Sequence, residues 1–83
     1  MKTIKQEKEE AREKYGHFNS THEVYAVLLE EVDEFWELVR QKPQIRTIVG
    51  YKKKENMVHE LTQIAAIAQR AIEELENNQI RWI

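Results

Sequence analysis

Apolar residues recur along most of this chain at the three- and four-residue spacing of amphipathic helices. The first such segment, residues 2–15, favours helix but is almost entirely polar. Only Ile4, Ala11 and Tyr15 lie at helical spacing in it, and Gly16 interrupts it. We therefore predict an N-terminal helix or arm that is only partly packed.

A second helix is predicted from Thr21 to about Gln41. Ser20 is a favourable N-cap, and Glu23 three residues later completes the pattern of a capping box. Pro43 cannot continue a helix and ends the segment. The apolar positions of this helix are Val24, Val27, Leu28, Phe35, Leu38 and Val39.

A connector at residues 42–50, closed by Gly50, leads to a last helix from about Lys53 to Asn77. The residues after it end in the apolar sequence IRWI, so we expect residues 77–83 to dock on this subunit or on a neighbour. The apolar positions of the last helix are Met57, Leu61, Ile64, Ala68, Ala71, Ile72 and Leu75.

The pattern predicts an all-α fold, in which a helical hairpin and an N-terminal helix form a single domain over residues 1–83. Residues 17–76 would be the core helices, and residues 1–16 the arm. A chain of 83 residues is small, and a core of this size supplies only about 3–5 kcal/mol of stability. We therefore expect homo-oligomerisation into a helical bundle, as a dimer or a tetramer.

Composition narrows the possible functions. The absence of cysteine excludes disulfides and thiolate chemistry. A net charge of −2 gives no overall attraction to nucleic acid or to an anionic membrane, and no stretch approaches the roughly 20 apolar residues of a membrane span. Because the N-terminal segment also lacks the apolar core of a signal peptide, we predict a cytoplasmic protein without nucleic-acid or membrane partners.

Three acidic residues lie beside the apolar positions of the two long helices. Glu31 and Glu34 are i,i+3 neighbours, about 60° apart around the helix axis, and Val27 and Leu38 flank them. Glu60 lies between Met57 and Ile64 on the other helix. Most of the other acidic residues, by contrast, are expected to be solvated, in particular Glu7, Glu9, Glu10, Glu13, Glu73, Glu74 and Glu76.

Carboxylates that face one another across a helix pair need compensation. One possibility is Mg²⁺, a hard cation that prefers oxygen ligands and often bridges carboxylates to substrate phosphates. The other is a set of salt bridges with Lys and Arg at a helix interface. The spacing of the acids leaves both open.

Two segments that contain these acids resemble the MazG-like all-α nucleoside triphosphate pyrophosphohydrolases. That family shows EExxE on one helix and ExxD on a later helix. Residues 29–35 (LEEVDEF) supply EExxE with Glu30, Glu31 and Glu34, and residues 59–66 (HELTQIAA) supply Glu60 of the second motif. The family's aspartate is Gln63 here.

The resemblance implies Mg²⁺-dependent hydrolysis of a (deoxy)nucleoside triphosphate to the monophosphate and pyrophosphate, with Mn²⁺ as a possible substitute. By position, Glu31, Glu34, Glu60 and Gln63 would be the metal ligands. Glu30 and Glu31 would be the catalytic residues, with Glu30 a further ligand or a group that orients the attacking water. The neutral amide of Gln63 can coordinate Mg²⁺ but cannot act as a base.

Five further residues are candidates for binding the substrate, and each also has a purely structural interpretation. Lys53 and Lys54 would contact the triphosphate or be a solvated helix start. Trp36 would stack on a base or lie in a core or interface. His17 and Asn19 would line a base pocket or be surface and capping residues.

Two hypotheses of function follow. The first is the hydrolase described above, serving to clean the nucleotide pool. The second is a catalytically weakened or inactive helical oligomer that acts as a nucleotide-binding or interaction module, and the amide at Gln63 favours it.

Overall fold

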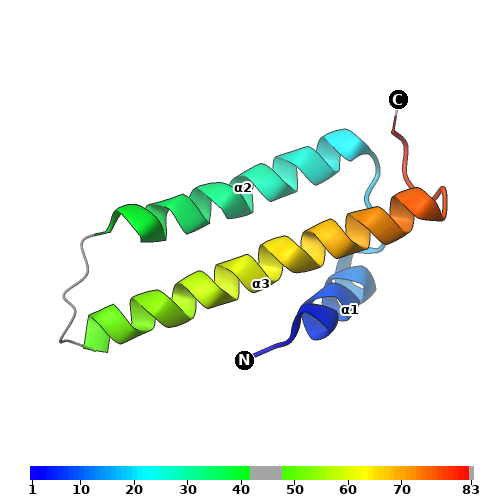
Figure 1. Ribbon diagram of the computed structural model, residues 1–83. Coiled ribbons are helices and arrows are strands. Elements are labelled where there is room, and N and C mark those ends of the chain that lie inside the picture. The colour runs from blue at the N-terminus through cyan, green and yellow to red at the C-terminus, as the bar shows by residue number, and fades with distance from the viewer. Residues whose placement is uncertain (42–47, 83) are drawn as a thin grey trace.

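The computed structural model describes the backbone of residues 1–41 and 48–82 and the side chains of residues 1–41 and 53–82. Three helices form this part of the protein: α1 (Ile4–Tyr15), α2 (Thr21–Arg40) and α3 (Ile48–Glu76). Helices α2 and α3 lie antiparallel, and α1 packs against α3 near the end of the hairpin where the chain terminates (Figure 1). The predicted all-α class is confirmed, because the described residues contain helices and no strand.

The first helix is held at both ends by local hydrogen bonds. The Thr3 hydroxyl accepts from the Gln6 N–H, and the Gln6 side chain accepts from the Thr3 N–H. This is a capping box that the sequence analysis did not identify. Gly16 ends the helix with a positive φ of 72°, and its N–H donates to the Arg12 carbonyl over 2.8 Å.

Helix α2 begins where the sequence predicts. The Ser20 hydroxyl accepts from the Glu23 N–H over 3.3 Å. Glu23 in turn accepts from the side-chain amide of Asn19 over 2.8 Å. Asn19 thus stabilises the start of this helix together with Ser20.

Helix α3 begins at Ile48, earlier than the predicted start near Lys53. Gly50 therefore lies inside the helix and does not close a connector as predicted. One glycine in a helix interior costs only about 1 kcal/mol relative to alanine, which is too little to end a helix of 29 residues. The rest of the predicted connector, residues 42–47, lies outside the described residues.

The hydrophobic core is small and lies at the α1 end of the hairpin. Phe18, Val24, Ala71 and Ile80 are buried there, with Val27, Leu28 and Ile67 packed against them. The backbone next to Ile80 is fixed as well, because the Thr21 N–H donates to the Arg81 carbonyl over 2.8 Å. The chain end therefore packs beside the start of α2 (Figure 1).

Glu74 was predicted to be solvated, and this was wrong. Its side chain is fully buried and accepts a 2.7 Å hydrogen bond from the Phe18 N–H. Arg70 and Arg12 lie 3.3 and 3.5 Å from its carboxylate, and His17 Nδ1 lies 3.6 Å away. Glu74 therefore joins α3 to α1 and to the segment between α1 and α2.

Glu73 was also predicted to be solvated, but it forms ion pairs with Lys8 at 2.6 Å and with Arg12 at 3.2 Å. These pairs hold the pKa of Glu73 below its usual range, chiefly through the hydrogen bond from Lys8. The polar helix α1 is thus fixed to α3 by charge pairs as well as by its few apolar residues.

None of the three described helices is both long enough and apolar enough to cross a membrane.

Candidate metal centre

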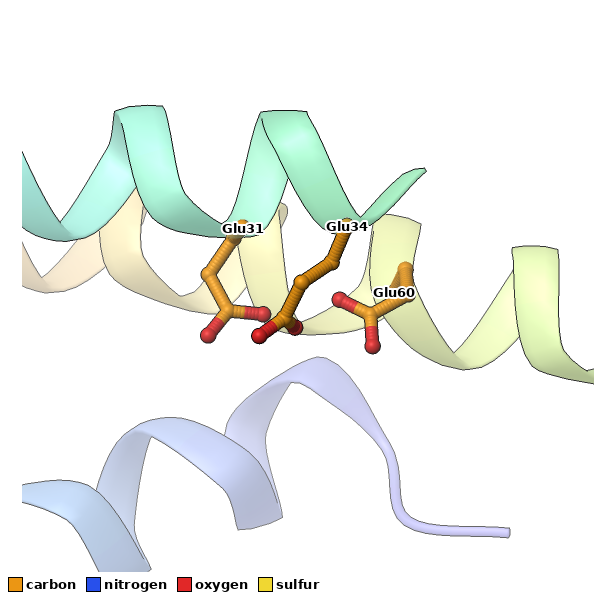
Figure 2. Close-up of side chains that lie close together, drawn as sticks. All are labelled: Glu31, Glu34 and Glu60. Carbon is orange, nitrogen blue, oxygen red and sulfur yellow. The ribbon is translucent and has the colours of Figure 1, made fainter. Parts of the chain in front are cut away.

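Glu31 and Glu34 of α2 and Glu60 of α3 come together in the middle of the hairpin. Each offers a carboxylate oxygen, and the three oxygens lie within 4.8 Å of one another. Figure 2 shows the three side chains converging on the side of the hairpin where α1 lies. We call these three residues the acidic cluster.

The helical periodicity explains this convergence. Residues three apart on a helix share a face, so Glu31 and Glu34 both project from α2 toward Glu60. Glu31 and Glu60 are half-buried and Glu34 is exposed. The cluster is therefore partly removed from water and open at one edge.

The electrostatics of the cluster are unfavourable for three ionised carboxylates. Loss of hydration, followed by a hydrogen bond shared with Glu60 and the charge of Glu34, raises the pKa of Glu31 to about 8. The pKa of Glu34 is also raised, first by loss of hydration and then by the charge of Glu60. The cluster thus retains protons at a pH where isolated carboxyls have lost them, unless a cation compensates its charge.

The salt-bridge interpretation requires a Lys or Arg beside these carboxylates. Within residues 1–41 and 53–82, none of the ion pairs involves Glu31, Glu34 or Glu60. The Oε2 atoms of Glu31 and Glu60 are buried, and no N–H or hydroxyl group of the described residues donates a hydrogen bond to them. Buried carboxylate oxygens normally have a partner. A proton shared between Glu31 and Glu60 supplies one without metal, and the three converging carboxylates also match the oxygen ligands of a hard divalent cation.

A groove of about 550 Å³ runs beside the cluster, between α1 and α2 and over α3. Glu31 and Gln63 line it, together with Val27 and Glu23 of α2 and Arg70 of α3. Its volume lies within the roughly 300–1,000 Å³ of ordinary ligand sites. The acidic cluster is therefore at the edge of a space large enough for a small molecule.

Gln63 and Glu30, the other two residues of the predicted motifs, differ in burial and in their position relative to the groove. Gln63 is half-buried and lines the same groove as Glu31. Glu30 is exposed, and its charge contributes to the raised pKa of Glu34. Glu30 therefore stands beside the cluster without being one of its converging carboxylates.

Three predicted substrate-binding residues do not line the groove. Lys53 donates to the carbonyls of Val39 and Gln41 at the end of α2. Lys54 is exposed, and 56% of Trp36 is exposed. Trp36 is therefore not a core residue of this chain.

His17 and Asn19 lie at the start of α2, away from the converging carboxylates. His17 is beside Glu74 and Asn19 beside Glu23. Neither side chain lines the groove, although Glu23 does. In this structure their contacts are those of capping and connecting residues.

The sequence analysis missed the contribution of α1 to the groove. Its α1 side is formed by Glu7, Lys8, Glu10, Ala11, Lys14 and Tyr15, and Phe18 follows them. The only available signal was the helical spacing of Ala11 and Tyr15, which was treated as a thin packing stripe. The α1 wall of the groove thus carries two lysines and two glutamates, and Tyr15 is its exposed aromatic side chain.

The fold and the cluster define the class of protein: a small helical protein with three converging carboxylates beside a groove. No family model, no curated protein and no solved structure matches this chain.

Proposed function

We propose that this protein binds Mg²⁺ through Glu31, Glu34 and Glu60 and hydrolyses a (deoxy)nucleoside triphosphate to the monophosphate and pyrophosphate. The observation that carries the proposal is the convergence of three carboxylates within 4.8 Å, with no Lys or Arg of residues 1–41 and 53–82 in an ion pair with them. The resemblance of residues 29–35 and 59–66 to the MazG-like hydrolases supplies the reaction. Mn²⁺ would serve in place of Mg²⁺, since both take oxygen ligands.

The residues around the cluster have distinct roles in this proposal. Glu31, Glu34 and Glu60 hold the cation, and the amide oxygen of Gln63 is a neutral fourth ligand. Glu30, exposed beside them, orients the attacking water and accepts its proton. Bound Mg²⁺ would neutralise charge on the phosphates and lower the pKa of a coordinated water.

The groove suits the rest of a nucleotide. Lys8 and Lys14 of α1 and Arg70 of α3 are its cationic groups, beside the acidic Glu7 and Glu10 of α1, and Tyr15 is its exposed aromatic side chain. Phe18 is buried, and the guanidinium of Arg70 lies 3.7 Å from the centre of its ring. Lys8 is already paired with Glu73, which makes Lys14 the better candidate for a phosphate contact. Aromatic stacking on a base contributes about 1–3 kcal/mol in other nucleotide-binding proteins.

The test is pyrophosphate release from a panel of common and damaged nucleoside triphosphates, with and without Mg²⁺. We expect turnover that requires Mg²⁺ and falls at least about 100-fold in Glu34→Gln and Glu60→Gln. Glu37→Gln on α2 and Glu55→Gln on α3 are matched controls, because both residues are exposed and lie outside the cluster. Absence of turnover on the whole panel would refute the proposed activity.

A second candidate function is a nucleotide-binding module without catalysis, and Gln63 is the observation that favours it. An amide in the groove brings no charge to the cation and cannot take a proton. Gln63→Asp distinguishes the two functions. A large gain in activity would mean that the natural protein is a weakened hydrolase, whereas strong activity in the unmodified protein would argue against the second function.

We also propose that the chain self-associates, as its small core and the resemblance both suggest. Only five apolar side chains are buried in the described part of the chain: Phe18, Val24, Ala66, Ala71 and Ile80.

A further inference from the structure

The face that α1 presents to the hairpin is largely charged. None of the twelve residues of α1 is fully buried, and five are half-buried on one side of the helix: Ile4, Glu7, Lys8, Ala11 and Arg12. Three of these five carry a charge, and only Ile4 and Ala11 are apolar. A helix of 12 residues is marginally stable in water by itself, so α1 depends on its contacts with α3.

Ion pairs make up most of these contacts. Glu73 of α3 lies 2.6 Å from Lys8 and 3.2 Å from Arg12, and we call these three residues the latch. Their side chains are 40%, 17% and 29% exposed. Dissolved salt can therefore screen the latch, as it screens other ion pairs that are open to water.

Helix α1 lies over the part of the molecule where a ligand would bind. It forms one wall of the groove, and the carboxylates of the acidic cluster converge on the same side of the hairpin (Figure 2). Ala66 of α3 lines the groove and is only 4% exposed, although it is not a member of the hydrophobic core. The floor of the groove is thus buried while α1 is in place.

We propose that α1 is a lid over the groove and the acidic cluster, and that it opens about Gly16 when the latch breaks while the hairpin stays folded. Opening admits a ligand to the groove, and closing encloses it. A ligand that contacts both α1 and α3 binds the closed form better and shifts the lid toward it. This inference concerns access to the groove and does not depend on the proposed reaction.

The hairpin keeps its core when α1 separates. Within residues 1–41 and 53–82, the buried members of the core all follow Gly16 in the chain: Phe18, Val24, Ala71 and Ile80. The buried carboxylate of Glu74 has Arg12 of α1 at 3.5 Å, but it also has two partners outside α1. These are the Phe18 N–H at 2.7 Å and Arg70 at 3.3 Å. Opening therefore leaves Glu74 paired.

Gly16 has the properties of a hinge. It follows the last residue of α1 with a φ of 72°, and a Cβ placed on it would meet no neighbouring atom within 4 Å. Two residues later, Phe18 is fixed by its burial and by its hydrogen bond to Glu74. Because glycine adopts many backbone conformations at little cost, rotation at Gly16 can move α1 while Phe18 stays in place.

The absence of cysteine in this chain allows a direct test. A single cysteine is placed on the groove floor in Ala66→Cys and, as a matched control, in the core in Ala71→Cys, where the alanine is 6% exposed. The rate of reaction with a neutral, bulky thiol reagent is measured without metal or nucleotide in about 0.05 M and about 1 M KCl. We expect Ala66→Cys to react at least about threefold faster in the higher salt and Ala71→Cys to change little.

The latch is tested by adding Glu73→Gln to both cysteine variants. The reaction at residue 66 should then be at least about fivefold faster, and its salt dependence should shrink, because Glu73 takes part in two of the ion pairs. Glu76→Gln is the control, since Glu76 is an exposed residue of α3 outside the latch. Equal acceleration at residues 66 and 71 would mean that Glu73 stabilises the whole fold, and this would overturn the lid. A rate at residue 66 that neither salt nor Glu73→Gln changes would also overturn it.

Hydrogen exchange tests the same motion in the natural protein. Amides of residues 8–15 should exchange at least about tenfold faster than those of residues 66–76, because α1 loses its helical structure readily once it separates. The ratio should rise with salt. A common rate for α1 and α3, or a ratio that salt leaves unchanged, would contradict the lid. The pyrophosphate assay decides the proposed reaction separately from either result.

Discussion

Replacing Glu31 with glutamine should stabilise the metal-free protein at neutral and alkaline pH, although it removes a proposed ligand. In the natural protein the pKa of Glu31 rises from 4.5 to about 8, first through loss of hydration and then through Glu60 and Glu34. One pKa unit corresponds to about 1.4 kcal/mol, so the full change corresponds to about 5 kcal/mol. Because Glu31 is partly open to solvent, screening reduces the expected effect to about 1–2 kcal/mol.

The sign follows from proton binding. An unfolded chain releases the Glu31 proton near pH 4.5, whereas the folded protein retains it up to about pH 8. The folded state therefore binds more protons between these values, and the free energy of unfolding falls as pH rises through this window. Glutamine has no such proton, so Glu31→Gln should lack this fall.

The assay is urea unfolding in a chelator at pH 5 and at pH 8. The advantage of Glu31→Gln should be small at pH 5 and reach about 1–2 kcal/mol at pH 8, while the control Glu55→Gln should show no such pH-dependent gain. Mg²⁺ at about ten times its dissociation constant should then stabilise the natural protein by about 1.4 kcal/mol at pH 8 and have little effect on the variant. A variant that is less stable than the natural protein at pH 8 in chelator would refute the electrostatic reasoning.

Three further predictions concern other residues. Glu74→Ala should lower the free energy of unfolding by about 3–5 kcal/mol, because it leaves Arg70 buried without its carboxylate; a loss below about 1 kcal/mol in urea unfolding would contradict the buried role of Glu74. Gln63→Asp should tighten Mg²⁺ binding by about tenfold or more in calorimetry, since it adds a charged ligand, and unchanged affinity would place residue 63 outside the metal site. Gly16→Ala should lower the free energy of unfolding by about 1–3 kcal/mol. A Cβ at Gly16 would meet no neighbouring atom, so the strain would come from its φ of 72° alone. An unchanged melting temperature would contradict this.

The local signals of the sequence predicted the helices well, because capping and periodicity depend on residues close in the chain. Ser20 and Glu23 fixed the start of α2 correctly. The start of α3 was wrong because Gly50 was treated as a stop, whereas a long helix tolerates one glycine. The burial of Glu74 had no local signal, since its partner Phe18 lies 56 residues away in the chain.

The acidic cluster was also predictable, because it depends largely on the spacing of residues close in the chain. The i,i+3 spacing of Glu31 and Glu34 gives their shared face, and an antiparallel hairpin brings Glu60 opposite them. The groove was not predictable, because α1 is nearly all polar and its position depends on ion pairs such as Lys8 with Glu73. The sequence left Trp36 as a core, interface or base-stacking residue, and the structure excludes the core of this chain, because 56% of Trp36 is exposed.

The acidic cluster lies in the half of the hairpin with the least apolar burial, and this has an energetic consequence. Residues 29–40 and 53–65 contain Glu31, Glu34 and Glu60 but no fully buried apolar side chain. Carboxylate repulsion opposes the pairing of α2 and α3 there, and the core at the α1 end does not reach it. A bound cation would remove this repulsion, so cation binding should stabilise this half of the hairpin more than the end that contains the core.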